Sequence, residues 1–272
     1  TYIFNGEGKI SGNTSIMKSG KGIFVLNNNN DYSGNTYVYD GIFEVNGKLE
    51  KSKVFVKGYG KIRGLGEFTK GVIFCNEGKL IIGDYLNNKG KLYIKDSLVL
   101  QKNALILLDL TDDPTNVNKI NDMLFVDGDL VFYDSLKIII NKIDYLANSG
   151  LYDLIEWTGN LKGNISKIKI IGIDDSRYQL IVEDKKIKIF TNWNKKLIWK
   201  GNISSSWDMG KTKNWWDGQN YDIFVANDTV VFDDGSFVFQ NDYKLSAELR
   251  GFKSDYIEII GNIYEHPELL NK

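Results

Sequence analysis

The stretch "GIFVLNNNNDYSGNTYVYDGIFEV", residues 22–45, contains one phrase twice. Gly22 opens the run IFVL, and Gly41 opens the run IFEV. Glycines that open an apolar run come again at Gly60 and Gly78, so the steps are 19, 19 and 18 residues. A repeat of this length is typical of a solenoid, because one repeat buries its apolar run only by stacking on its neighbours. We therefore expect equivalent strands to lie about 4.8 Å apart in successive coils.

The rest of the chain carries strand signals and almost no helical spacing. Short runs rich in β-branched and aromatic residues are bounded by Gly, Asn and Asp. The expected strands are 23–26, 36–39, 42–45, 54–56, 105–108, 123–126, 136–140, 168–171, 187–190 and 230–232. The predicted fold class is all-β, a single-stranded parallel β-helix. A β-sandwich or propeller is the alternative, but hairpin signals are few, and Asn46-Gly47 is the one that fits a two-residue turn.

A second phrase, glycine then lysine then an apolar run, opens at Gly78 and again at Gly90. We interpret this phrase as a pattern that lets successive coils stack on each other. The glycine would turn the corner with a positive φ, which costs glycine alone nothing. The lysine would face water, and the next leucine, Leu80 or Leu92, would point into the core.

Composition excludes several classes of function. Lys and Arg number 34 against 35 Asp and Glu, so the chain has no basic footprint for nucleic acid. One cysteine, Cys75, and one histidine, His266, allow neither a disulfide framework nor a Cys/His metal cluster. No stretch reaches the ~20 apolar residues of a membrane-spanning helix. The chain starts at Thr1, and we expect it to be a fragment or a processed product of a longer protein.

Residues 18–47 resemble the autotransporter-associated β-strand repeat, which reads K-x-G-x-G-x-L-x-L, then N-x-Y-x-G-x-T, then x-x-G-x-L-x-V. The matching positions are Lys18, Gly20, Gly22, Phe24, Leu26, Asn30, Tyr32, Gly34, Thr36, Gly41, Phe43 and Val45. Two phenylalanines replace the usual leucines. The resemblance implies a right-handed β-helix on the surface of a diderm bacterium or secreted from it, in a parent chain with an outer-membrane translocator barrel.

Later phrases resemble the coils that follow in such passengers. The first comprises Asp122, Leu124, Val126, Gly128 and Leu130, and the second Gly150, Tyr152, Leu154 and Ile155. A third contains Trp199, Gly201, Trp207, Asp208, Asn214, Trp215, Asp228, Val230, Phe232 and Asp233. In the family this Trp-rich phrase often starts a new module. We therefore predict parallel coils over residues 1–191 and a Trp-rich solenoid segment that starts a new module over residues 192–272.

The candidate sites each have a plain structural interpretation. Adjacent aspartates at 112–113, 174–175 and 233–234 lie beside turn signals, and adjacent residues of a strand point to opposite faces. We interpret these pairs as turn caps, not as the two facing carboxyls of a glycosidase. His266 has no nucleophile motif nearby. The run Asn27–Asn30 is predicted to be a protruding loop, with a stacked amide ladder as the alternative.

The tryptophans offer two interpretations, a filled core at the module boundary or a platform that stacks on sugar rings. Trp193 and Trp216 fall outside the family pattern, so they are the best candidates for a surface binding site. No catalytic, cofactor or metal residue is predicted.

We expect a non-catalytic structural or adhesive segment of a bacterial cell-surface or secreted fibre. Its partners would be copies or modules stacked end to end, because unpaired strand edges invite further strands, and host or cell-surface glycans. The alternative is a β-helix polysaccharide lyase or hydrolase, or a carbohydrate-binding module.

Overall fold

A computed structural model describes residues 1–75, 77–84, 86–116, 119–142, 146–147, 149–173, 177–192, 195–200, 213–224, 228–231, 237–241, 244–245 and 258–262. These residues are almost entirely strand and connecting turn, with one short 3₁₀ helix, η1 (Ile165–Lys167). No helix in this part of the chain is long and apolar enough to cross a membrane. The structure divides into two compact units, Thr1–Asn192 and Trp193–Lys272. The sequence-based boundary falls between residues 191 and 192.

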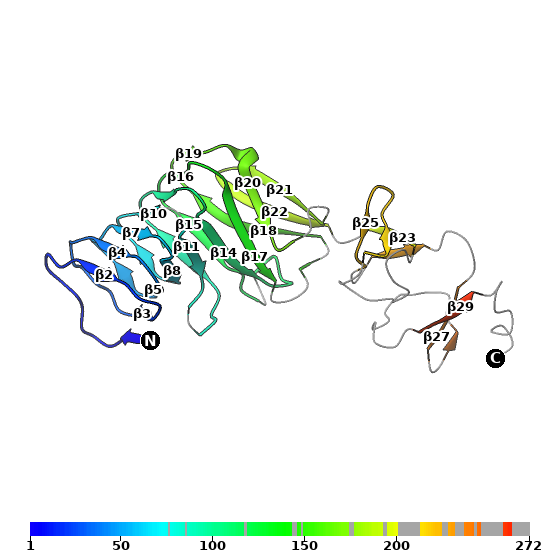
Figure 1. Cartoon of the computed structure of the whole chain (residues 1–272), viewed down its shortest axis with the longest axis horizontal. Helices are drawn as coiled ribbons and strands as arrows, with labels where there is room; N and C mark the ends of the chain where they lie inside the picture. Colours follow the sequence, from blue (N-terminus) through cyan, green and yellow to red (C-terminus); the bar gives the residue numbers. More distant parts are fainter. Residues whose placement is uncertain are drawn as a thin grey trace. The chain divides into compact units, whose positions relative to one another are not determined.

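The first unit contains three sheets (Figure 1). Sheet 1 comprises β1 (Tyr2–Phe4), β3 (Ile23–Leu26), β5 (Ile42–Val45), β8 (Lys61–Gly64), β11 (Lys79–Ile82), β14 (Leu105–Leu110), β17 (Leu136–Lys142) and β20 (Ile168–Ile171). Sheet 2 comprises β2 (Ile16–Lys18), β4 (Thr36–Val38), β7 (Val54–Lys57), β10 (Val72–Cys75), β13 (Leu98–Leu100), β16 (Leu130–Phe132) and β19 (Leu161–Lys162). Sheet 3 comprises β6 (Lys48–Leu49), β9 (Glu67–Phe68), β12 (Lys91–Ile94), β15 (Met123–Val126), β18 (Ser149–Trp157), β22 (Lys186–Asn192) and β21 (Tyr178–Glu183).

Consecutive strands belong to different sheets. From β5 to β19 the chain visits sheet 1, sheet 3 and sheet 2 in turn, and we call each such set of three strands a layer. Every pairing in sheets 1 and 2 is parallel. The prediction of an all-β protein with long parallel sheets is confirmed, and the arrangement is compatible with a β-solenoid. Asn46-Gly47 makes no hairpin, because β5 and β6 lie in different sheets.

The repeated phrase sets the register of sheet 1. Ile23 pairs with Ile42, Ile42 with Lys61, and Lys61 with Lys79, so the strands that follow the four glycines lie directly side by side. One residue further along each strand runs the ladder Phe24, Phe43, Ile62, Leu80, Ile106, Ile138, Ile170, of which all but Phe24 are buried. Sheets 2 and 3 carry similar buried ladders, Val38 to Phe132 and Leu49 to Trp157. These ladders form the core, because each strand hides its apolar side only against its neighbours.

The prediction that Gly78 and Gly90 turn with a positive φ is wrong, because neither has one. Of the four glycines spaced 18 or 19 residues apart, only Gly41 has a positive φ, of 68°. Gly60 and Gly78 are needed for close approach: a Cβ on Gly60 would lie 2.4 Å from a carbonyl oxygen of Val38, and one on Gly78 would lie 2.6 Å from the Phe74 ring. The two Gly-Lys phrases, at Gly78 and Gly90, bury their leucines as predicted, but they belong to different sheets and do not stack on each other.

Parallel pairing ends in sheet 3. β22 pairs antiparallel with β18, and β21 pairs antiparallel with β22, where parallel coils were predicted up to residue 191. The turn between them has Asp184 and Lys185 at φ values of 48° and 57°, the two positive values of a type I′ hairpin. The expected strand 187–190 therefore exists, in the opposite direction.

The second unit contains two described sheets. β25 (Tyr221–Asp222), β24 (Trp215–Trp216), β23 (Lys196–Trp199) and β26 (Thr229–Val231) form one, and β28 (Lys244–Leu245), β27 (Phe237–Asn241) and β29 (Glu258–Asn262) form the other. Of their pairings only β23 with β26 is parallel. That this unit starts a new solenoid module stays a prediction.

Candidate functional site

The residues of the repeat motif hold neighbouring layers together. The Lys18 ammonium is buried and donates to the carbonyl oxygens of Ser19, Gly20 and Asp40, the last 22 residues away. Burial lowers the pKa of Lys18, and three accepting carbonyls compensate for the lost hydration. Gly41 lies against the same corner, because a Cβ there would meet the Gly20 oxygen at 2.4 Å. Lys18 thus ties the backbone of neighbouring layers together at this corner, and we call this set of hydrogen bonds the Lys18 clamp.

Two more motif positions form a buried hydroxyl chain. Tyr32 Oη and Thr36 Oγ1 lie 2.5 Å apart, and Thr36 Oγ1 lies 2.8 Å from Ser52 Oγ in the next layer. Burial raises the pKa of Tyr32, so this phenol stays protonated and keeps its proton available for the hydrogen bond. Asn30 is also buried; its side-chain Oδ1 accepts from the N–H of Ile10, and its Nδ2 donates to the carbonyl oxygen of Asn28. These polar groups are satisfied within the protein and act in folding.

The asparagine run does not form the predicted protruding loop. Asn27 donates to Asn5 Oδ1 at 2.5 Å, and Asn46 donates to Asn27 Oδ1 at 2.9 Å. These three residues follow neighbouring strands of sheet 1, so they make an amide ladder across the layers. The stacked amide ladder, which was the alternative for this run, is therefore correct at Asn27. Asn30 is buried.

A buried carboxylate that the sequence did not single out for chemistry directly precedes β15. Asp122 accepts from the N–H of Gly90 at 3.0 Å and from the N–H of Asp109 at 2.8 Å. Burial raises its pKa to about 6, against the lowering effect of these two hydrogen bonds. The side chain joins two layers, that of β14 and β15 and that of β11 and β12, and has no exposed surface. Such a position suits a structural tie and not a group that meets substrate.

The adjacent aspartates behave as predicted where they can be observed. Asp113 accepts from the N–H of Thr115 and of Lys119, and Asp112 forms an ion pair with Lys119 at 2.8 Å. Both carboxylates thus belong to one local turn. The pairs at 174–175 and 233–234 lie outside the described residues, as does His266. Among the described residues, no three His, Cys, Asp or Glu side chains gather closely enough to hold a metal ion.

The Trp-rich segment packs aromatic rings on one another. Trp215 is fully buried, with its ring 4.8 Å from that of Trp199 and 5.0 Å from that of Phe224. Trp216, one of the two candidates for a surface site, is half-buried with its ring edge-on to Tyr221 at 5.1 Å. Trp193, the other candidate, lies outside the described residues.

An ion-paired lysine lies in the same segment as these tryptophans. Lys195 Nζ lies 2.9 Å from Asp217 and 2.8 Å from Asp222. Burial opposes ionisation of Asp217, but the N–H groups of Asn220 and Gln219, together with Lys195, outweigh it and lower the pKa to about 2.

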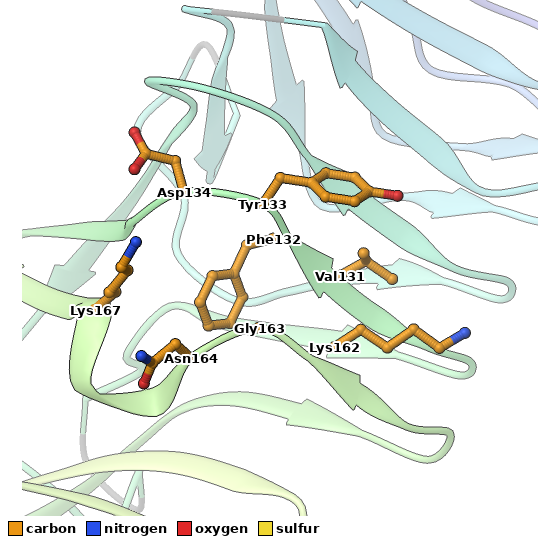
Figure 2. A pocket seen from close by; sticks show the side chains of 8 residues that line it. All are labelled: Val131, Phe132, Tyr133, Asp134, Lys162, Gly163, Asn164 and Lys167. Carbon is orange, nitrogen blue, oxygen red and sulfur yellow. The ribbon is translucent and has the colours of Figure 1, made fainter.

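Two hollows lie at the carboxyl ends of the sheet 2 strands. The first, about 300 Å³ in volume, follows β16 and β19 and is lined by Val131, Phe132, Tyr133, Asp134, Lys162, Gly163, Asn164 and Lys167. Figure 2 shows Tyr133 and Lys162 on one side of the Phe132 ring and Asp134, Asn164 and Lys167 on the other. The second hollow, about 470 Å³, follows β7, β10 and β13 and is lined by Gly58, Tyr59, Cys75, Glu77, Lys102 and Asn103.

Local contacts shape the first hollow. A Cβ on Gly163 would lie 2.5 Å from the Phe132 ring, so only glycine leaves room for this ring under the next layer. Asn164 caps η1 by accepting from the N–H of Ser166 at 3.0 Å, which holds the turn that carries Lys167. Lys162 forms an ion pair with Asp129 at 2.6 Å, and that bond raises the pKa of Lys162. The sequence analysis did not identify this corner.

Comparison with known families gives one match, to the family described as YopX protein, over residues 168–271. The matched range begins at β20 and runs through the closing hairpin and most of the second unit. It covers less than half of the chain. No curated protein matches the chain.

Proposed function

We propose that residues 1–171 form a right-handed, single-stranded parallel β-helix, and that the chain is a non-catalytic structural and adhesive segment of a bacterial surface or secreted fibre. The observation that carries this proposal is the register of sheet 1, in which buried ladder residues pair from β5 to β20 without a break. Stacked layers of this kind resist extension along the stack, since many backbone hydrogen bonds share the load. The segment would extend or display what is attached to it.

The described carboxylates favour this function over a polysaccharide lyase or hydrolase. A glycosidase needs two carboxyls that face each other across a cleft, roughly 5 to 9.5 Å apart. Here Asp122 is buried between backbone amides, Asp113 caps its own loop and Asp129 pairs with Lys162. Each of these three carboxylates is thus engaged in a contact within the chain. Turnover of any member of a panel of polysaccharides by the purified chain, at enzymatic rates, would overturn the non-catalytic assignment.

The resemblance of the repeat motif to autotransporter passengers supports a place on the bacterial surface. In this chain the motif residues Lys18, Tyr32 and Thr36 act as ties between layers, which is the role a stalk requires. The test is to add protease or antibody to intact cells that produce the protein. We expect the chain to be accessible without lysis, and protection until the cells are broken would contradict a surface location.

The end at β1 is the place where we propose that a neighbouring module or copy stacks. β1 is the edge strand of sheet 1, and the side chains of Tyr2, Ile3 and Phe4 are exposed on it. An edge with free N–H and C=O groups and apolar side chains accepts a further strand. At the other end, sheet 3 finishes in the antiparallel strand β21, which interrupts the parallel order. Sedimentation over a range of concentrations tests this, and a Tyr2→Lys, Phe4→Lys variant should associate less than the unmodified chain.

A further inference from the structure

We propose that the two hollows at the end of sheet 2 are two subsites for one neutral oligosaccharide. This proposal deepens the proposed adhesive function and rests on it for its biological meaning, while the binding itself can be measured separately. The two hollows lie on one continuous corner of the first unit. Strands β7, β10, β13, β16 and β19 are consecutive neighbours in sheet 2 and all parallel, so the residues that follow them emerge on the same side.

Both hollows are lined by a tyrosine, a carboxylate, lysine, an asparagine and a glycine. Each has one strongly exposed tyrosine at its rim: Tyr59 is 73% exposed and Tyr133 is 72% exposed. Neither hydroxyl bonds to another described residue in the structure. Such rings, apolar in body and polar at the tip, suit a surface that binds sugars, because the ring covers C–H groups and the hydroxyl bonds to a sugar oxygen.

The polar groups around both tyrosines balance in charge. Glu77 and Lys102 face the second hollow, and both are exposed. In the first hollow, Asp134 stands with Lys167, and Lys162 is already neutralised by Asp129. A site of net charge near zero that offers both donors and acceptors matches hydroxyl groups, which donate and accept. It does not favour a polyanion, which would need unpaired cations.

The spacing of the tyrosines sets the length of the ligand. Tyr59 follows β7 and Tyr133 follows β16, three strands further along sheet 2. At about 4.8 Å per strand the two sites lie about 14 Å apart along the stack. A disaccharide reaches one of them and a hexasaccharide reaches both. Binding should therefore strengthen steeply with length, as the second contact becomes intramolecular.

The experiment is isothermal titration of the full chain with neutral hexasaccharides of glucose and of N-acetylglucosamine, the matching disaccharides, and a hexasaccharide of a uronic acid. We expect at least one neutral hexasaccharide to bind more tightly than its disaccharide and more tightly than the uronic acid chain. Tyr59→Ala and Tyr133→Ala should each weaken hexasaccharide binding by roughly tenfold. Leu86→Ala, which removes an apolar side chain 63% exposed between β11 and β12 and outside both hollows, should leave it unchanged.

Several outcomes would overturn the proposal: no binding of either neutral hexasaccharide, binding of the uronic acid chain alone, or equal binding by the two corner variants and the unmodified chain. All three side chains, Tyr59, Tyr133 and Leu86, are exposed, so the variants should keep the circular dichroism spectrum of the parent, which controls for folding. If the protein binds glycans but fails the surface-accessibility test, the oligosaccharide site is supported and the proposed surface location is refuted. If the protein is exposed on cells but binds no glycan, the location is supported and the site is refuted.

Discussion

Replacing Leu80 by alanine tests the strand register of sheet 1 at a single buried apolar side chain. Leu80 lies in β11, is fully buried, and pairs with Ile62 on one side and Ile106 on the other. Large-to-small changes at such positions cost about 2–5 kcal/mol, since they lose apolar burial and leave a cavity between rigid neighbours. The next residue, Ile81, points to the opposite face and is only half-buried. Ile81→Ala should cost about 1 kcal/mol or less.

Urea unfolding followed by far-ultraviolet circular dichroism measures the difference. With a slope of about 2 kcal/mol per molar urea, Leu80→Ala should lower the unfolding midpoint by about 1–2.5 M and Ile81→Ala by about 0.5 M or less. The adjacent pair is a matched control, because a slip of one residue in register would exchange the two faces. Equal effects, or a larger effect at Ile81, would refute the assigned register of sheet 1.

Three further changes test individual ties between layers. The folded-state pKa of Asp122, about 6, exceeds its ordinary value of 3.8, so its contribution to the free energy of unfolding is full below pH ~4 and falls by about 3 kcal/mol as the pH rises through 6. Asp122→Asn should abolish that part of the pH dependence of the urea midpoint, and an unchanged pH dependence would contradict the assignment. Gly60→Ala places a Cβ against a carbonyl oxygen and should lower the melting temperature by several degrees, while Gly22→Ala, which meets open space, should not; equal shifts would argue against close approach at Gly60. Lys18→Met leaves three carbonyls without their donor and should cost about 1–3 kcal/mol in urea unfolding, against little for the exposed Lys21→Met; a neutral Lys18 variant would rule out the clamp.

The sequence predicted the part of the fold that repeats at constant spacing. Gly22, Gly41, Gly60 and Gly78 placed four strands of sheet 1 in their correct register, because from Gly41 to Gly78 the chain passes through sheets 3 and 2 and returns to sheet 1 in steps of 19 and 18 residues. Later layers are longer, since loops enter between β11 and β12 and between β14 and β15. The constant period is then lost, although strand composition still locates the strands.

Other features of the fold depend on contacts that no local sequence pattern predicts. The β21–β22 hairpin turns at Asp184-Lys185, a dipeptide without the Asn-Gly signal of a type I′ turn. The amide ladder joins Asn27 to Asn5 and Asn46, which are recognisable as equivalent only once the layers are aligned.

The corner hollows were missed for a similar reason. Tyr59 and Tyr133 are 74 positions apart in the chain, and only the order of sheet 2 brings them to one side. The surface candidates Trp193 and Trp216 were chosen from a family pattern, and they stay predictions.

The most direct measurement of the stacked layers is a pair of distances between spin labels on the solvent side of sheet 1. Lys61 pairs with Lys79, Lys79 with Leu105, Leu105 with Lys137 and Lys137 with Lys169. In a Cys75→Ser background, labels at Lys61 and Lys137 should have backbones about 14 Å apart, and labels at Lys61 and Lys169 about 19 Å apart. Pulsed electron paramagnetic resonance that finds the second distance longer by about one strand spacing supports the account. A second distance equal to or shorter than the first, as in an antiparallel meander, would contradict it.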